Sequence, residues 1–98
     1  MSMIQSFGNQ TAADLFREQN TREARALPKE LWRSAQRKLK AIDVAAQLED
    51  LLIPSGNRLE KLKGTRRRHH SLRINDQYRI TFRWEAGHAY EVSVEDYH

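Results

Sequence analysis

The chain has 98 residues, a net charge of +4 and no cysteine. This length predicts one domain over residues 1–98 with a modest core, and the missing cysteines exclude a disulfide framework and a thiolate metal site. No apolar run reaches the roughly 20 residues of a membrane span, and the N-terminus lacks the layout of a signal peptide, so we expect a cytoplasmic protein without membrane contact.

The N-terminal region predicts a short strand and then a short helix. Residues 4–7 can form the strand. Thr11 and Asp14 have the spacing of a capping box, which predicts a helix that runs to about Glu18 and is ended by Asn20.

A longer helix is predicted to begin at Pro28, whose fixed φ angle suits the first helical position. Its apolar residues recur at helical spacing: Leu31, Ala35, Leu39 and Ile42. The residues between them are mostly polar, so this helix is amphipathic and can cover a sheet.

A further short helix is predicted over residues 44–52. Asp43 would cap it, and Leu48 with either Leu51 or Leu52 would point inward. Residues 54–57 then break the structure because they combine proline, serine, glycine and asparagine. A short strand or extended segment is expected between Leu59 and Leu62.

The last third of the chain predicts a three-stranded meander. Residues 71–74, 77–84 and 90–97 alternate apolar and polar side chains, and the turns at 75–76 and 85–87 contain residues that tolerate positive φ. One face is expected to be apolar: Leu72, Ile74, Tyr78, Ile80, Phe82, Trp84, Tyr90, Val92 and Val94. The other face is expected to be polar: Ser71, Arg73, Gln77, Arg79, Thr81, Arg83, Glu91, Ser93, Glu95 and Tyr97.

The positive charge is concentrated in one part of the chain. Residues 58–83 contain nine Lys and Arg against Glu60 and Asp76, a local charge of +7, so the remainder sums to −3. A basic surface of this kind attracts polyanions, of which nucleic acid is the commonest. The alternative is an ordinary solvated surface on which the charges cluster by chance.

No common cofactor motif is present, and the four histidines are too scattered to propose a metal site. In a strand, the adjacent His69 and His70 would point to opposite faces. The C-terminal residues 95–98 combine two carboxylates, a phenol and an imidazole. Tyr97 shares its parity with Glu91, Ser93 and Glu95, so we expect it to lie on the same face as Arg79; the alternative is a disordered terminus.

Several motifs along the chain together resemble the RelE/ParE toxin superfamily, and within it the HigB-like branch of plasmid-maintenance killer toxins. The resemblance covers nearly the whole chain and suggests that Met1-Ser2 is either an extra start or an added remnant, with Met3 as the native start. The motifs are Met3-Ile4-Gln5-Ser6-Phe7, Lys38-Leu39 with Ile42-Asp43 and Ala45, Asn57-Arg58-Leu59 with Leu62 and Gly64, the segment from Ser71 to Phe82, and Glu95-Asp96-Tyr97-His98.

The resemblance implies an α+β fold, in which two or three N-terminal helices pack on one face of a small, mostly antiparallel twisted sheet. Members of the HigB-like branch are toxins of type II toxin–antitoxin systems. They act as mRNA interferases that cut messenger RNA on the ribosome without a metal or other cofactor. The implied partners are the ribosome, messenger RNA and a HigA-like helix-turn-helix antitoxin, through which operator DNA would be bound.

The resemblance also implies catalytic roles for particular residues. Arg79 matches the central sheet arginine and would bind phosphate and stabilise the transition state, and Lys63 would supply a second cation. Tyr97 and His98 match a terminal pair that transfers protons or orients the nucleophile, and Asp96 matches a carboxylate that orients them.

Glu60 lies where some HigB-like relatives carry a histidine. It is therefore either a catalytic base, a charge that weakens RNA binding, or a solvent-facing strand residue. A further set of arginines is expected to contact ribosomal and messenger RNA phosphates: Arg58, Arg66, Arg67, Arg68, Arg73 and Arg83.

Two other functions fit the same residues. A ParE-like toxin of this fold would inhibit DNA gyrase without nuclease chemistry. A plain interaction module would bind RNA on the basic face without cutting it.

Overall fold

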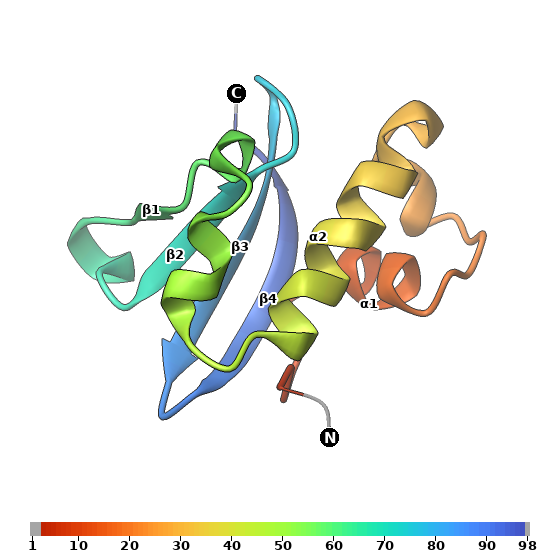
Figure 1. Cartoon of the computed structure of the whole chain (residues 1–98). Helices are drawn as coiled ribbons and strands as arrows, with labels where there is room; N and C mark the ends of the chain where they lie inside the picture. The colour runs from red at the N-terminus through yellow and green to blue at the C-terminus, as the bar shows by residue number, and fades with distance from the viewer. Residues whose placement is uncertain (1–2, 98) are drawn as a thin grey trace.

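The chain forms an antiparallel sheet of four strands in the order β1-β2-β3-β4 (Figure 1). The computed structural model describes residues 3–97, so Met1-Ser2 and the proton-transfer role expected of His98 lie outside the described residues. The strands are β1 (Glu60–Lys61), β2 (His69–Arg73), β3 (Tyr78–Glu85) and β4 (His88–Asp96). The predicted meander is therefore confirmed, and the short segment between Leu59 and Leu62 adds a fourth strand at its edge.

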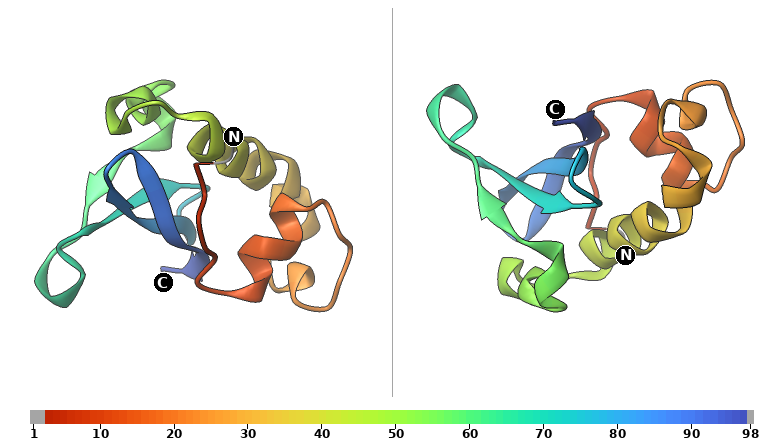
Figure 2. Two further views of the ribbon diagram at one scale, coloured as in Figure 1. Left: turned by 90° about the horizontal axis from the view of Figure 1, so that it is seen from below. Right: turned by 90° about the horizontal axis from the view of Figure 1, so that it is seen from above.

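Two α-helices cover the apolar face of the sheet, α1 (Gln10–Phe16) and α2 (Trp32–Val44). Both views of Figure 2 place the helices on one side, while the connection between β1 and β2 projects on the other. Leu39 and Ile42 of α2 pack against Leu72, Ile80 and Phe82 of the sheet, and all five side chains are fully buried. The α+β arrangement with helices on one face is thus confirmed.

The first helix starts differently from the prediction. Asn9, rather than Thr11, is its cap, because the Asn9 side chain accepts a hydrogen bond from the backbone N–H of Ala12 at 3.0 Å. The same side chain donates to the backbone carbonyl of Val94 in β4 at 2.8 Å. The helix ends at Phe16, before the predicted end at Glu18, which has a positive φ of 57°. Asn9 therefore fixes α1 to the last strand as well as starting it.

The next two helical boundaries also differ. Pro28 precedes a 3-10 turn, Lys29–Leu31, and α2 begins only at Trp32. Asp43 lies inside α2 and does not cap the following turn, because its side chain accepts a hydrogen bond from the backbone N–H of Ile4 at 3.1 Å. The 3-10 helix Leu48–Leu52 is capped instead by Gln47, in a capping box with Asp50. Of its leucines, Leu51 is buried and Leu52 is exposed.

Residues 4–8 run parallel to β4 and make isolated bridges to it rather than a full strand. The backbone N–H of Gln5 donates to the carbonyl of Ala89, and that of Gly8 donates to the carbonyl of Val92, each at 2.8 Å. A Cβ atom on Gly8 would lie only 2.8 Å from the carbonyl oxygen of Glu91, so this close approach requires glycine. The predicted strand is therefore only partly formed.

A bulge in β4 changes which face Tyr90 occupies. Val94 pairs with Ile80 and Tyr90 pairs with Arg83, so two residues of β4, Glu91 and Val92, lie opposite the single residue Phe82. Glu91 adopts a positive φ of 55° at this point. The prediction that Tyr90 lies on the apolar face is wrong, because its ring stacks on the Arg83 guanidinium at 4.6 Å. The buried Ala89 takes the apolar position beside Trp84.

Candidate functional site

Four of the six predicted catalytic residues meet at one pocket on the polar face of the sheet: Glu60, Lys63, Arg79 and Tyr97. The pocket has a volume of about 330 Å³. Strand β1 contributes Glu60, the connection after it contributes Lys63, and β3 contributes Arg79. Tyr97 follows the end of β4. Lys61, Leu62 and Ser71 complete the lining.

Arg79 is the central group of this pocket. Its side chain is only 17% exposed, and its Nη1 atom donates to Oε1 of Glu60 at 2.6 Å. The Tyr97 ring lies against the guanidinium, with 5.2 Å between the ring centroid and Cζ. Glu60 and Tyr97 therefore both contact the Arg79 guanidinium. The prediction that Tyr97 and Arg79 share a face is confirmed.

The structure does not bring Asp96 into this group. Asp96 pairs with Tyr78 across the sheet and accepts a hydrogen bond from the side chain of Gln77 at 3.1 Å. Together with Tyr78 and Val94 it lines a different, smaller cavity beside Thr11. The Asp96 carboxylate therefore lies apart from the Arg79 pocket.

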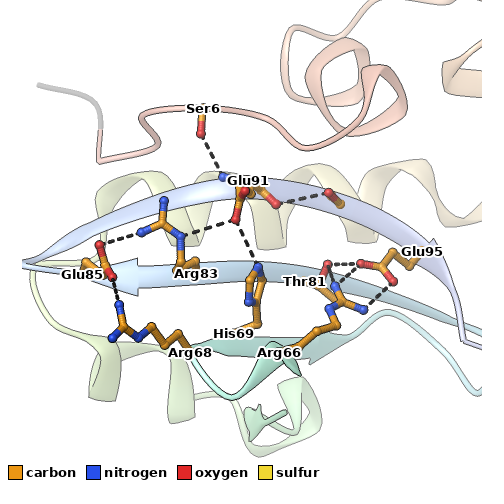
Figure 3. Close-up of polar contacts among 10 residues, drawn as sticks. Ser6, Arg66, Arg68, His69, Thr81, Arg83, Glu85, Glu91 and Glu95 are labelled. Atoms are coloured by element: carbon orange, nitrogen blue, oxygen red, sulfur yellow. Dashed lines mark hydrogen bonds and ion pairs between the residues drawn. The ribbon is translucent and has the colours of Figure 1, made fainter. Parts of the chain in front are cut away.

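Carboxylates accompany most of the arginines on the polar face. Figure 3 looks onto this face and shows acidic side chains of β3 and β4 beside arginines of β3 and of the connection before β2. Among residues 3–97, the ion pairs of arginine outside the Arg79 pocket are Arg66–Glu95, Arg68–Glu85, Arg73–Asp76, Arg83–Glu85 and Arg83–Glu91. This face is thus a network of paired charges rather than an array of isolated cations.

The Arg66–Glu95 pair anchors the connection between β1 and β2 to the sheet (Figure 3). Arg66 donates through both terminal nitrogens to Glu95, at 3.0 and 2.5 Å, and also donates to the Thr81 hydroxyl at 3.2 Å. Thr81 in turn donates to Glu95. The hydrogen bonds from Arg66 hold the pKa of Glu95 below its ordinary value, and Glu95 raises the pKa of Arg66. Both groups are therefore charged, and the loop that carries Lys63 is tethered close to the pocket.

Within residues 3–97, four cations of the segment 58–67 form no ion pair: Arg58, Lys61, Lys63 and Arg67. Lys61 and Lys63 line the pocket itself. Of the six arginines expected to contact RNA, Arg58 and Arg67 are exposed without such a partner, and the other four each pair with a carboxylate. The unpaired cations follow the chain from the end of the 3-10 turn Ser55–Asn57 through the β1–β2 connection.

Sequence reasoning missed two polar residues beside this site. Ser71 lies opposite Glu60 in the sheet, is only 1% exposed, and its hydroxyl has no hydrogen-bond partner among the described residues. His69 is 3.3 Å from Glu91, and its Nδ1 atom is likewise buried without a partner. His70 packs on the Phe82 ring on the apolar face, which confirms that the two adjacent histidines point in opposite directions. The alternation of the strand put Ser71 on the polar face, but no local pattern in the sequence showed that the polar atoms of His69 and Ser71 would be buried.

A larger cavity of about 560 Å³ lies between the end of α1 and α2, with Phe16, Arg33, Arg37 and Lys40 in its lining, and contains none of the predicted site residues.

Within the described part of the chain, no group of three or more His, Asp or Glu side chains is arranged to hold a metal ion. None of the helices over residues 3–97 has the length and apolar character needed to cross a membrane.

Known proteins resemble this chain over most of its length. The sequence model of the RelE-like toxin of the type II toxin–antitoxin system HigB matches residues 5–98. The toxin HigB-1 of Vibrio cholerae is 38% identical over 71 residues, which cover 72% of this chain and 75% of that toxin. An uncharacterized protein of Haemophilus influenzae is 34% identical over 59 residues, which cover 60% of this chain and 58% of that protein. The chain therefore belongs to the HigB-like family of RelE-type toxins from type II toxin–antitoxin systems, a family that implies an antitoxin partner.

Proposed function

We propose that this toxin is an mRNA interferase, a ribosome-dependent endoribonuclease that cuts messenger RNA without a metal and so stops translation. The observation that carries the proposal is the pocket in which a half-buried basic group, Arg79, lies beside Lys63, Glu60 and Tyr97. Cleavage of RNA by its own 2′-hydroxyl requires this combination of a cation and proton-transfer groups. The site of action would be the cytoplasm, where the ribosomes are.

The chemistry assigns one task to each type of group. A base takes the proton of the ribose 2′-hydroxyl, the 2′-oxygen bonds to the adjacent phosphorus, and the bond from phosphorus to the 5′-oxygen breaks. An acid returns a proton to the 5′-oxygen, which leaves as a hydroxyl, and the other fragment ends in a 2′,3′-cyclic phosphate. Arg79 and Lys63 would stabilise the charge on the phosphoryl oxygens, whereas Glu60, Tyr97 and His98 are the candidates for proton transfer.

The antitoxin proposed for this toxin is a HigA-like helix-turn-helix protein that would bind operator DNA as part of the complex. The separation of Asp96 from the pocket favours a role for this residue in positioning the chain end, through Gln77, rather than in direct contact with RNA. Ribosomal and messenger RNA phosphates would first meet the unpaired cations Arg58 and Arg67.

The test is a cleavage assay on ribosomes programmed with one defined message, in which the ends of the fragments are mapped. Wild-type protein should produce fragments with a 5′-hydroxyl, and Arg79→Ala should produce none while its unfolding curve stays close to wild type. Arg22→Ala, which removes an exposed arginine on the helical side, is the matched charge control and should cut normally.

Three results would sink the proposal. One is cleavage by Arg79→Ala at the wild-type rate. Another is an intact message together with a loss of DNA gyrase supercoiling on addition of the wild-type protein, which would assign the toxin to the gyrase inhibitors. An intact message on which the protein stays tightly bound would point to a non-catalytic RNA-binding module.

A further inference from the structure

The guanidinium of Arg79 already holds an anion in the free protein. Glu60 places Oε1 2.6 Å from Nη1 of Arg79, and the arginine side chain is mostly buried. A carboxylate and a phosphodiester present similar anionic oxygens to a guanidinium, and both form short charge-assisted hydrogen bonds with it. Glu60 therefore occupies an edge of Arg79 that a phosphate would otherwise use.

Glu60 is the more exposed member of this pair. Its side chain is 58% exposed, compared with 17% for Arg79, and it belongs to the two-residue strand β1 at the edge of the sheet. Exposed ion pairs of this kind are weak because water and salt compensate for their loss. Arg79 keeps its position through the Tyr97 ring and the central strand β3, so the carboxylate can leave without disturbing the arginine.

A second feature of the pocket, the hydroxyl of Ser71, also points to a ligand there. Its hydroxyl is buried in the pocket lining, directly across the sheet from Glu60, and has no hydrogen-bond partner among the described residues. Buried hydroxyl groups in folded proteins are nearly always paired, because an unpaired one loses its hydrogen bond to water and gains nothing. An acceptor oxygen in place of the Glu60 carboxylate would satisfy it.

We propose that Glu60 takes the place of a substrate phosphodiester on Arg79 in the free toxin, and that RNA binds by displacing it. The hydroxyl of Ser71 then donates to a phosphate oxygen and completes the phosphate site. This inference rests on the proposed RNA substrate and adds an exchange step to it. The same pair also discriminates against weaker anions, because a ligand must compete with an internal carboxylate before it reaches Arg79.

A purely structural role for Glu60 predicts the opposite result. If the carboxylate serves only to orient Arg79, its removal must weaken phosphate binding. If it competes with phosphate, its removal must strengthen binding. The sign of the change therefore decides between the two roles.

Fluorescence anisotropy measures the affinity of the protein for a short single-stranded RNA in which every ribose carries a 2′-O-methyl group. Such an RNA has no free 2′-hydroxyl and cannot be cut, so the result does not depend on catalysis. Glu60→Gln should bind it about fivefold more tightly than wild type. The matched control is Asp76→Asn, which also removes a carboxylate from an arginine pair but lies outside the pocket lining. It should change the affinity by less than about twofold.

A double-mutant cycle separates this exchange from a general change in charge. In an Arg79→Ala background, Glu60→Gln should no longer strengthen binding, because the two residues act on one phosphate. Ser71→Ala should weaken binding about threefold, with an unfolding curve at least as stable as wild type because the unpaired hydroxyl is gone.

Weaker or unchanged binding by Glu60→Gln overturns the inference, as does an absence of binding by both wild type and Glu60→Gln. An equal gain from Asp76→Asn overturns it too, since the effect would then be one of net charge. If the wild-type protein does not cut messages on ribosomes but the cycle gives the expected result, the proposed catalysis fails and the phosphate exchange stands.

Discussion

Arg66 and Glu95 are separated by 29 positions in the chain and form a two-point ion pair across the polar face of the sheet. The pair connects the loop after β1 to the last strand, and Thr81 lies fully buried beneath it. The cation that sequence reasoning assigned to RNA is thus part of the framework around the pocket.

Glu95→Gln should lower the free energy of unfolding by about 1 kcal/mol, because the Arg66 guanidinium loses its charged partner and keeps only neutral hydrogen bonds. Urea denaturation at pH 7 measures the change. Asp76→Asn, which breaks the pair between Arg73 and a carboxylate that is 97% exposed, is the control and should cost less than about 0.5 kcal/mol. Equal effects of the two substitutions would show that Arg66–Glu95 is an ordinary surface pair.

The decrease in the free energy of unfolding at acid pH should depend on Asp14. This buried carboxylate accepts hydrogen bonds from Thr21 at 2.6 Å and Gln10 at 2.7 Å, which hold its pKa below the ordinary value. Because the pKa is lower in the folded state than in the unfolded state, its contribution is complete above the unfolded value of about 4 and is lost as the pH falls through the lower folded value.

Thr21→Val removes the largest cause of that pKa shift. The variant should therefore unfold at a lower urea concentration than wild type at pH 7, and the difference between the two should shrink as the pH falls from about 5 to 2. A difference that stays constant over this range would mean that Thr21 contributes by packing alone. Urea midpoints at intervals of half a pH unit are sufficient to decide.

Gly8→Ala should destabilise the protein by about 2 kcal/mol, because the new methyl group would meet the backbone carbonyl of Glu91. The strained contact falls at the β4 bulge, where residues 4–8 dock. Gly56→Ala is the control, since a Cβ atom there has no neighbour within 4 Å, and it should leave the unfolding midpoint nearly unchanged. Similar losses from both alanines would contradict the close approach.

Tyr97→Phe should separate the phenol hydroxyl from the ring that stacks on Arg79. The ring contact remains, so stability should be unchanged, whereas the single-turnover rate of message cleavage should fall about 100-fold if the hydroxyl takes part in proton transfer. Tyr90→Phe is the matched control, because Tyr90 stacks on Arg83 outside the pocket lining and should retain the wild-type rate. An unimpaired Tyr97→Phe would restrict Tyr97 to positioning Arg79.

The alternation of side chains predicted the sheet well but could not reveal the bulge. Ile80 and Phe82 are buried as their parity requires, and Val94 follows from the same rule. Tyr90 does not follow the alternation, because the bulge at Glu91, which has a positive φ, moves the earlier residues of β4 to the opposite face of the sheet. The helix starts were missed for a related reason, since the Asn9 cap is selected by its contacts with β4, some 85 positions away.

The sequence predicted the part of the candidate site that depends only on which face of a strand each residue occupies. The shared face of Arg79 and Tyr97 follows from β3 and β4 alone. The ion pairs of the arginines could not be predicted in this way. The local charge was counted over residues 58–83, and β4 supplies carboxylates from outside that range, such as Glu91 and Glu95. Ser71 was missed since its burial depends on what lies over the polar face, which no local pattern records.

The docking of residues 4–8 on β4 also determines when this protein can assemble. Apart from its hydrogen bond to Asp43, the first segment of the chain docks on the last strand, and contacts of such long range form slowly. An incomplete chain that stops before β4 carries Lys63 and Arg79 but lacks both the Tyr97 wall of the pocket and the anchor for α1. A product that stops before β4 would therefore lack the strand on which residues 4–8 and the cap of α1 dock, so it could not complete the fold described here.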